Sequence, residues 1–199
     1  NKGQVFEIRL KHRTEVTEDT RVVTRTIHYS LANGTKVSED YTVHLRFTRQ
    51  ATKDFVTGSI SYSDWQTLDG NAFHSVTSPI LIGYTPNPKQ VDKLSHVTAE
   101  TASSEITVTY IPKTVKARVN YIDDTNGKTL SSIRLSGLFG SQSDYKTNAA
   151  IQKYEARGYL LISDNFPTDG NIFTQEKETI FEIRLGHRFS SSQEIRTVS

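Results

Sequence analysis

The residue types best suited to bind a ligand lie around the single tryptophan, Trp65. Tyr62 precedes it by three residues, and Asn71 follows within the same polar stretch. An aromatic ring can stack on the apolar face of a sugar while neighbouring amide groups bind the hydroxyls at its rim. This pattern predicts a glycan-binding surface at Trp65, Tyr62 and Asn71. The alternative is that Trp65 packs in a core or between domains.

A row of charged side chains near the N-terminus offers a second surface. Apolar and charged residues alternate in FEIRLK from residue 6 to 11, which predicts a strand with Arg9 and Lys11 on its polar face. Such a row can meet sulfated or sialylated glycans. The alternative is a solvated face that protects a sheet edge from aggregation.

Oxygen ligands cluster in the turn DDTNG, where Asp123, Asp124 and Asn126 lie within four residues. Calcium prefers several carboxylate and amide oxygens on a short loop. The spacing does not match an EF-hand loop, and Asp and Asn are also the ordinary residues of a tight turn. A structural calcium is therefore one interpretation and a simple turn the other, and no other cofactor is expected.

Several classes of function find no support. The chain has no Cys, no nucleophile motif, no phosphate-binding glycine loop and no carboxylate pair in a catalytic context, so we expect no enzyme. A net charge of +2 gives no electrostatic support for binding nucleic acid. No apolar run approaches the roughly 20 residues of a membrane span, so we expect no membrane insertion.

The elements that would position these residues are mainly strands, in two halves with one plan. Each half has a predicted hairpin at an Asn-Gly turn, Asn33-Gly34 and Asn126-Gly127, and a later alternating strand that closes it. A helix is predicted from an N-cap at Asn148 to Gly158. Pro112 ends a strand, which predicts a first domain over residues 14–112, with an insertion, and a second over 113–188.

A nearly identical string of eight residues occurs at both ends of the chain. FEIRLKHR spans residues 6–13 and FEIRLGHR spans residues 181–188, with only one difference. This predicts that residues 1–13 are either the closing strand of a preceding repeat or an N-terminal strand, and that 189–199 begin the next repeat. A tandem array suits a protein that displays many copies of a binding surface, since multivalency raises the overall affinity.

Three segments of the second half resemble the MucBP domain of mucus-binding adhesins from Gram-positive bacteria: VNYIDDTNGKTL (residues 119–130), YKTNAAIQKYEARGYLLISDNFP (145–167) and TIFEIRL (179–185). The first half resembles the companion domain that precedes it in the Mub repeats of lactic acid bacteria. The resemblance implies an α+β fold of two consecutive small β-grasp, ubiquitin-like domains arranged end to end as a rod. It also implies an extracellular, cell-wall-attached protein.

Three functions then remain open. The first is an adhesion module that binds mucin glycans weakly per repeat and gains avidity from the array. The second is a module that binds a protein surface, immunoglobulin being the partner that the resemblance suggests. The third is a passive spacer that contacts only the neighbouring repeats of its own chain.

Overall fold

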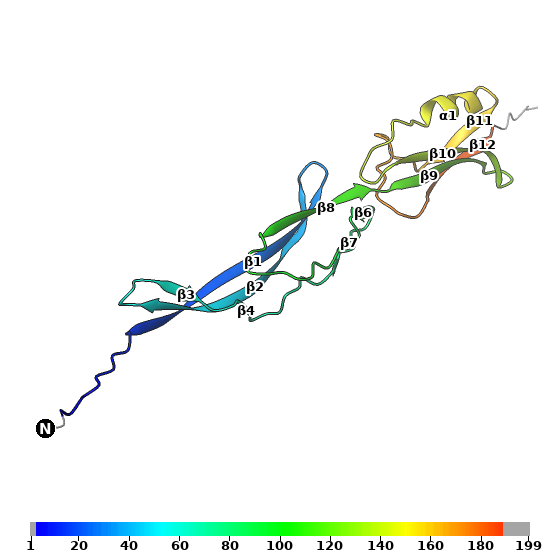
Figure 1. Cartoon of the computed structure of the whole chain (residues 1–199). Coiled ribbons are helices and arrows are strands. Elements are labelled where there is room, and N and C mark those ends of the chain that lie inside the picture. Colours follow the sequence, from blue (N-terminus) through cyan, green and yellow to red (C-terminus); the bar gives the residue numbers. More distant parts are fainter. Residues whose placement is uncertain (1–2, 189–199) are drawn as a thin grey trace, which may run out of the picture. The chain divides into compact units, whose positions relative to one another are not determined.

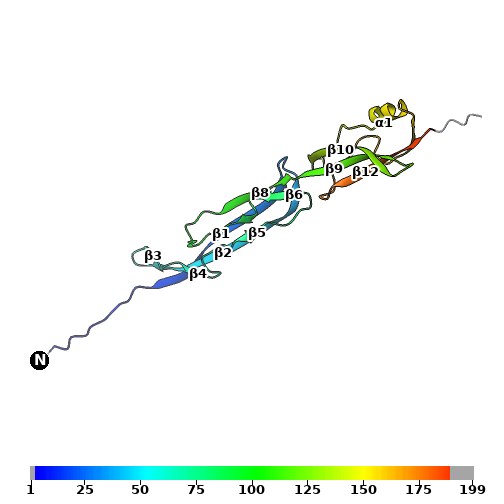
Figure 2. The ribbon, with the colours of Figure 1, turned by 90° about the vertical axis from the view of Figure 1, so that its right-hand side faces the viewer.

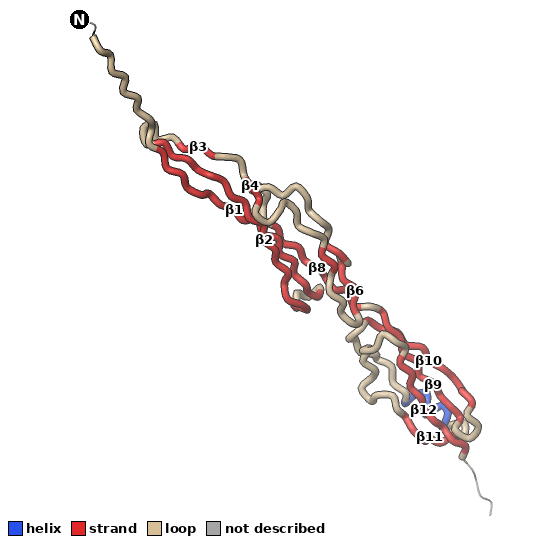
Figure 3. Tube along the Cα trace, turned by 90° about the horizontal axis from the view of Figure 1, so that it is seen from below, coloured by secondary structure: helices blue, strands red, loops and turns tan. Residues whose placement is uncertain are grey.

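The computed structural model describes residues 3–188, which are mostly strand with one short helix (Figure 3). The chain folds into two compact units. The first comprises the residues up to 79 together with 86–110, and the second comprises 80–85 and the residues from 111 onward. Within the described residues, no helix is long and apolar enough to cross a membrane.

The first unit is built on a long twisted hairpin, to which shorter strands add at both sides (Figure 1). β1 and β2 are antiparallel, and β8 runs parallel to β1. β2 also pairs with β3 and β4, β8 has β6 at its other edge, and β5 pairs with β7 separately. The strands are β1 (Thr14–Leu31), β2 (Lys36–Asp54), β3 (Ile60–Tyr62), β4 (Gln66–Thr67), β5 (Val76–Thr77), β6 (Tyr84–Asn87), β7 (Gln90–Val91) and β8 (Ser104–Pro112). Residues 84–85 of β6 and 111–112 of β8 belong to the second unit.

The turn of this hairpin is the predicted one. Gly34 has φ +85°, a conformation that glycine adopts without strain. Two register shifts follow, between Ile27 and Tyr29 and between Tyr29 and Ser30. These irregularities decide which residues face each other along the rest of the hairpin.

The core of the first unit lies along only part of the hairpin. Its buried cluster draws on β1, β2 and the loops that cover them: Val23, Leu45, Phe47, Phe73, Val97 and Ala99. From Thr14 to Val22 no residue of β1 is buried. The hairpin therefore runs on beyond its apolar core, and other interactions must hold that part of it.

The second unit is a four-stranded sheet with a helix on one face (Figure 2). The strand order is β10-β9-β12-β11, in which β9 and β12 are parallel and the outer pairs antiparallel. The elements are β9 (Thr114–Asp123), β10 (Lys128–Leu138), α1 (Asn148–Glu155), β11 (Tyr159–Asp164) and β12 (Thr179–His187). The predicted turn at Asn126-Gly127 joins β9 to β10, and Gly127 has φ +72°.

The predicted N-cap of the helix is displaced by one residue. Thr147, not Asn148, occupies that position. Its hydroxyl makes no capping bond but donates to the Asp164 carboxylate at 2.5 Å, which ties the start of the helix to the end of β11. The Thr147 hydroxyl therefore binds Asp164, which is distant in the sequence, instead of capping the helix locally.

The core of the second unit follows the alternation of its two central strands. Val119 and Tyr121 of β9 and Ile183 and Leu185 of β12 are fully buried, and the helix adds Ile151 above them. The opposite side chains of both strands face away from the helix. This sheet therefore has one covered face and one open face.

The stretch 80–85 is part of the second unit because of contacts at Gly83. Its amide donates to Glu176 at 2.9 Å, and its carbonyl accepts from the Lys113 amide at 2.8 Å. A Cβ at this position would clash with the ring of Phe139, and φ is +81°. Only glycine fits here.

The predicted strand at residues 6–11 is not formed. Residues 3–13 have no strand partner, and Ile8 is 84% exposed, whereas the matching Ile183 in the second copy of the string is 0% exposed. A strand needs a neighbour to satisfy its backbone groups, and β12 has β9 and β11 on either side. The predicted start of a further repeat at 189–199 lies outside the described residues.

We predict that Ile183→Ala lowers the free energy of unfolding by about 2–5 kcal/mol, because it leaves a cavity in a fully buried site. Ile180→Ala is the matched control, since Ile180 lies on the same strand but is 53% exposed. Urea unfolding of both variants measures the difference. Equal losses in the two variants would show that β12 does not bury Ile183 as described.

Candidate functional site

Tyr62 and Trp65 lie where two short strands follow the far part of the long hairpin. β3 pairs with β2 with Tyr62 opposite Ala51, and β4 pairs with β2 with Thr67 opposite Phe47. The chain between β3 and β4 therefore passes along β2 beside Arg49. This places two aromatic side chains next to one guanidinium.

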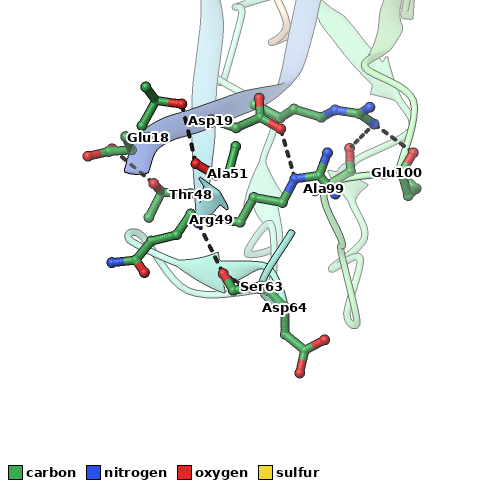
Figure 4. A network of polar contacts seen from close by, with 12 residues as sticks. Glu18, Asp19, Thr48, Arg49, Ala51, Ser63, Asp64, Ala99 and Glu100 are labelled. Atoms are coloured by element: carbon green, nitrogen blue, oxygen red, sulfur yellow. Dashed lines mark hydrogen bonds and ion pairs between the residues drawn. The ribbon is translucent and has the colours of Figure 1, made fainter. Parts of the chain in front are cut away.

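Arg49 is the centre of this arrangement. Its Cζ lies 3.8 Å from the ring centre of Tyr62 and 4.3 Å from that of Trp65. Its Nε donates to the Asp19 carboxylate on β1 at 2.8 Å (Figure 4). Cation–π contacts of this kind stabilise by about 0.5–2 kcal/mol, so they hold the hairpin where its apolar core has ended.

A second arginine adds to the same cluster. Arg21 places its Cζ 5.5 Å from the Trp65 ring centre and donates to Glu100 at 2.6 Å. We call Arg21, Arg49, Tyr62 and Trp65 the arginine–aromatic platform. Trp65 is half-buried and packs against the core cluster of the first unit, whereas Tyr62 is 53% exposed.

A shallow hollow of about 460 Å³ lies beside the platform. Most of the residues that line it are polar, and they come from β1, β2 and the chain around β3 and β4: Val16, Thr17, Glu18, Thr48, Arg49, Gln50, Ser63 and Gln66. Thr48 donates to Glu18 at 2.9 Å, and Ser63 accepts from the Gln50 amide at 3.0 Å (Figure 4). The hollow thus presents hydroxyl, amide and carboxylate groups next to an aromatic ring, which is the chemistry of a sugar-binding surface.

The structure brings together only part of the predicted glycan set. Tyr62 and Trp65 share the platform, while Asn71 is exposed in a loop and is not part of the hollow. Arg9 and Lys11 lie on the exposed tract before β1, where Arg9 pairs with Glu7 at 2.9 Å. The sequence analysis did not identify Arg49. The one feature that could have indicated it is the opposite charge of Asp19, which lies across the hairpin from it.

In the turn predicted to bind calcium, the carboxylate of Asp123 accepts hydrogen bonds from other groups of the protein. Asp123 is buried and accepts from the Thr125 amide at 3.0 Å, from Asn126 Nδ2 at 2.9 Å and from His187 Nε2 at 2.9 Å. Burial acts to raise the pKa of Asp123, but the hydrogen bonds from Thr125 and His187 outweigh it and lower that pKa.

Asp124 of the same turn pairs with Arg184 at 2.7 Å. Over residues 3–188, no group of three or more His, Cys, Asp or Glu side chains is arranged to hold a metal ion. A calcium ion at Asp123, Asp124 and Asn126 stays a prediction.

The loop that follows Trp65 and β4 is fixed by one ion pair. Arg46 donates to Asp69 through Nε at 2.9 Å, through its terminal nitrogen at 3.0 Å and through its backbone amide at 3.0 Å. The side-chain hydrogen bond from Arg46, followed by the bond from its amide, lowers the pKa of Asp69 to about 2. This contact anchors one end of the segment that carries the platform.

Comparison with known families assigns both halves of the chain. The model of the Muc B2-like domain matches residues 14–114, and that of the mucin binding domain matches residues 115–187. No curated protein matches the chain.

Three solved structures illustrate what this chain is similar to. Mub-RV is 33% identical, with a TM-score of 0.48 over 51% of this chain and 61% of that one. The mucin-binding domain of Spr1345 from Streptococcus pneumoniae is 29% identical, with a TM-score of 0.46 over 50% of this chain and 97% of that one. The type 2 repeat of MUB from Lactobacillus reuteri is 31% identical, with a TM-score of 0.40 over 51% of this chain and 60% of that one.

We predict that Asp69→Asn destabilises the first unit near neutral pH but not in strong acid. The pKa of about 2 in the folded state lies below the ordinary 3.8, so the stabilisation is full above pH 4 and is lost as the pH falls toward 2. Thermal unfolding followed from pH 6 to pH 2 should show the gap between wild type and variant closing over that window. Asp64→Asn is the control, and a gap that stayed constant with pH would contradict the prediction.

Proposed function

Because this chain belongs to the family of mucus-binding repeats formed by a Muc B2-like domain and a mucin binding domain, we propose that it is a non-catalytic adhesion module that binds mucin glycans. The observation that carries the proposal is that the two family domains follow each other without a gap from residue 14 to 187. Neither of them is a catalytic family. We also propose that the protein lies on the outer surface of a Gram-positive bacterium, attached to the cell wall, which the family membership supports.

The topology of the second unit supports its assignment to the β-grasp class. A hairpin, a helix and a last strand that returns parallel to the first give the order β10-β9-β12-β11. The first unit shares the central parallel pair, β1 and β8, but has no helix among its described residues. The end-to-end arrangement and the domain limits 14–112 and 113–188 stay predictions.

The arginine–aromatic platform is our candidate for the glycan contact in the first unit. Arg49 already stacks on Tyr62 and Trp65, so a sugar would meet the exposed phenol of Tyr62 and the polar lining of the hollow rather than a bare indole face. Few contacts in a shallow surface give weak binding, about millimolar to micromolar. A tandem array would raise the overall affinity through effective concentration.

One observation favours immunoglobulin, or another protein, as an alternative partner. Along β1, residues 14–23 pair with β2 on one side, and β8 begins to pair only at Arg25 on the other. Among the described residues, this edge has no strand beside it. A free edge of this length can accept a strand from a partner protein.

The deciding experiment is the binding of the purified chain to immobilised mucin, before and after enzymatic removal of the glycans, with immunoglobulin alongside. We expect binding that disappears on deglycosylation and increases when two copies of the chain are joined in tandem. Binding that survives deglycosylation, or that is seen with immunoglobulin alone, would favour the free edge of β1. Binding to nothing would overturn the proposal in favour of a passive spacer.

We predict that Tyr62→Ala weakens mucin binding about tenfold, or about 1.4 kcal/mol, because it removes the exposed ring of the platform. Tyr41→Ala removes another exposed tyrosine of the same hairpin and serves as the control. Surface plasmon resonance measures the affinity, and the fluorescence of the single tryptophan, Trp65, reports whether the platform stays intact. Equal affinities of the two variants would place the contact elsewhere.

A further inference from the structure

The open face of the second sheet carries a cluster of positive charge. On β9, Val115, Ala117 and Val119 point into the core, so Lys116 and Arg118 lie on the opposite face. The strand register places Arg134 of β10 directly opposite Arg118, and Ser136 directly opposite Lys116. Three cationic side chains therefore share a small area of one sheet face.

This cluster is only partly neutralised. Arg118 pairs with Glu178 at 3.0 Å. Lys116 and Arg134 form no side-chain ion pair or hydrogen bond with any residue between 3 and 188. Three cations against one carboxylate leave two positive charges without a partner.

Two features of this cluster are unfavourable in the free protein. Like charges directly opposite in an antiparallel pair, with Cβ atoms about 5 Å apart, destabilise a sheet. In addition, Arg118 Nε is buried and has no hydrogen-bond partner within the described chain. A buried donor without an acceptor destabilises the folded state. An external anion between Arg118 and Arg134 would offset the repulsion between the two guanidinium groups.

The same residues line a hollow that an anionic group can enter. It has a volume of about 420 Å³ and is lined by Lys116, Arg118, Arg134, Leu135, Ser136 and Glu178. We call it the basic groove. Ile180, which the register places beside Arg118, is 53% exposed and adds an apolar surface next to the charges.

We propose that the basic groove binds the anionic group of a charged sugar, either a sulfate ester or a sugar carboxylate. Guanidinium groups offer paired N–H donors that match the oxygens of both anions, and the ammonium of Lys116 adds a third donor group. Ile180 can contact the apolar face of the sugar ring. The proposal rests on the proposed function, because it names the part of a mucin glycan that the second unit would recognise.

The test is calorimetric titration of the full chain with galactose 6-sulfate, with N-acetylneuraminic acid and with neutral galactose, at low and at high ionic strength. We expect binding of one or both anionic sugars that weakens with added salt, and no binding of galactose. Binding of only one anionic sugar identifies the sulfate ester or the carboxylate as the group recognised. No binding of either by the wild-type chain overturns the proposal.

Arg134→Gln is the informative variant, because Arg134 has no partner whose loss would unfold the sheet. We expect it to bind the anionic sugar at least tenfold more weakly, and to melt at the same or a higher temperature than the wild type, since it removes a like-charge pair. Lys153→Gln is the matched control. It also removes one positive charge, but from α1, which covers the other face of the sheet, so it should bind the anionic sugar as the wild type does. Equal binding by Arg134→Gln, equal loss in Lys153→Gln, or a marked fall in the melting temperature of Arg134→Gln would overturn the proposal.

Mucin binding measured in parallel separates this proposal from the proposed function. A chain that binds mucin but neither anionic sugar would overturn the basic groove alone. A chain that binds an anionic sugar but not mucin would retain the groove and overturn the proposed function.

Discussion

The parallel pairing of the first strand with the last strand is the interaction on which each unit depends. In the second unit it joins β9 to β12, and in the first unit β1 to β8. A parallel pair cannot close through a tight turn, so the chain between the two strands must cross over and cover one face of the sheet. In the second unit that cover is α1, which buries Tyr121 and Ile183 beneath it. The other face stays open, and there the side chains are free to bind.

Both candidate surfaces lie where an apolar layer is missing, and they use arginine in opposite ways. In the first unit, Arg49 is held by Asp19 and by two aromatic rings, so it stabilises the hairpin and supports a surface that a sugar can contact. In the second unit, Arg134 lies opposite Arg118 without a carboxylate of its own. The first arrangement is complete in the free protein, whereas the second is completed by an anion.

The two copies of one string show how far a local sequence can determine a structure. Seven of their eight residues are identical, yet Ile183 is buried in the centre of a sheet and Ile8 is exposed on a tract with no strand partner. The alternation of apolar and charged residues shows only that the segment can form a strand. Whether the strand forms depends on neighbours such as β9 and β11, which supply its hydrogen bonds and cover its apolar side.

The sequence by itself determined the local elements: the hairpins at Asn33-Gly34 and Asn126-Gly127, the helix before Gly158 and the closing strands, because turn residues and period-two patterns act over a few residues. Only the tertiary structure determined which residues form the arginine–aromatic platform. Pairing continued from Ser30 opposite Lys36 would place Phe47 opposite Asp19, but two register shifts near Tyr29 place Arg49 there. A slip of two residues keeps every side chain on its own face, so the apolar pattern cannot reveal it. The basic groove also depends on register, because one shift between Thr129 and Ser131 of β10 sets Arg134 opposite Arg118.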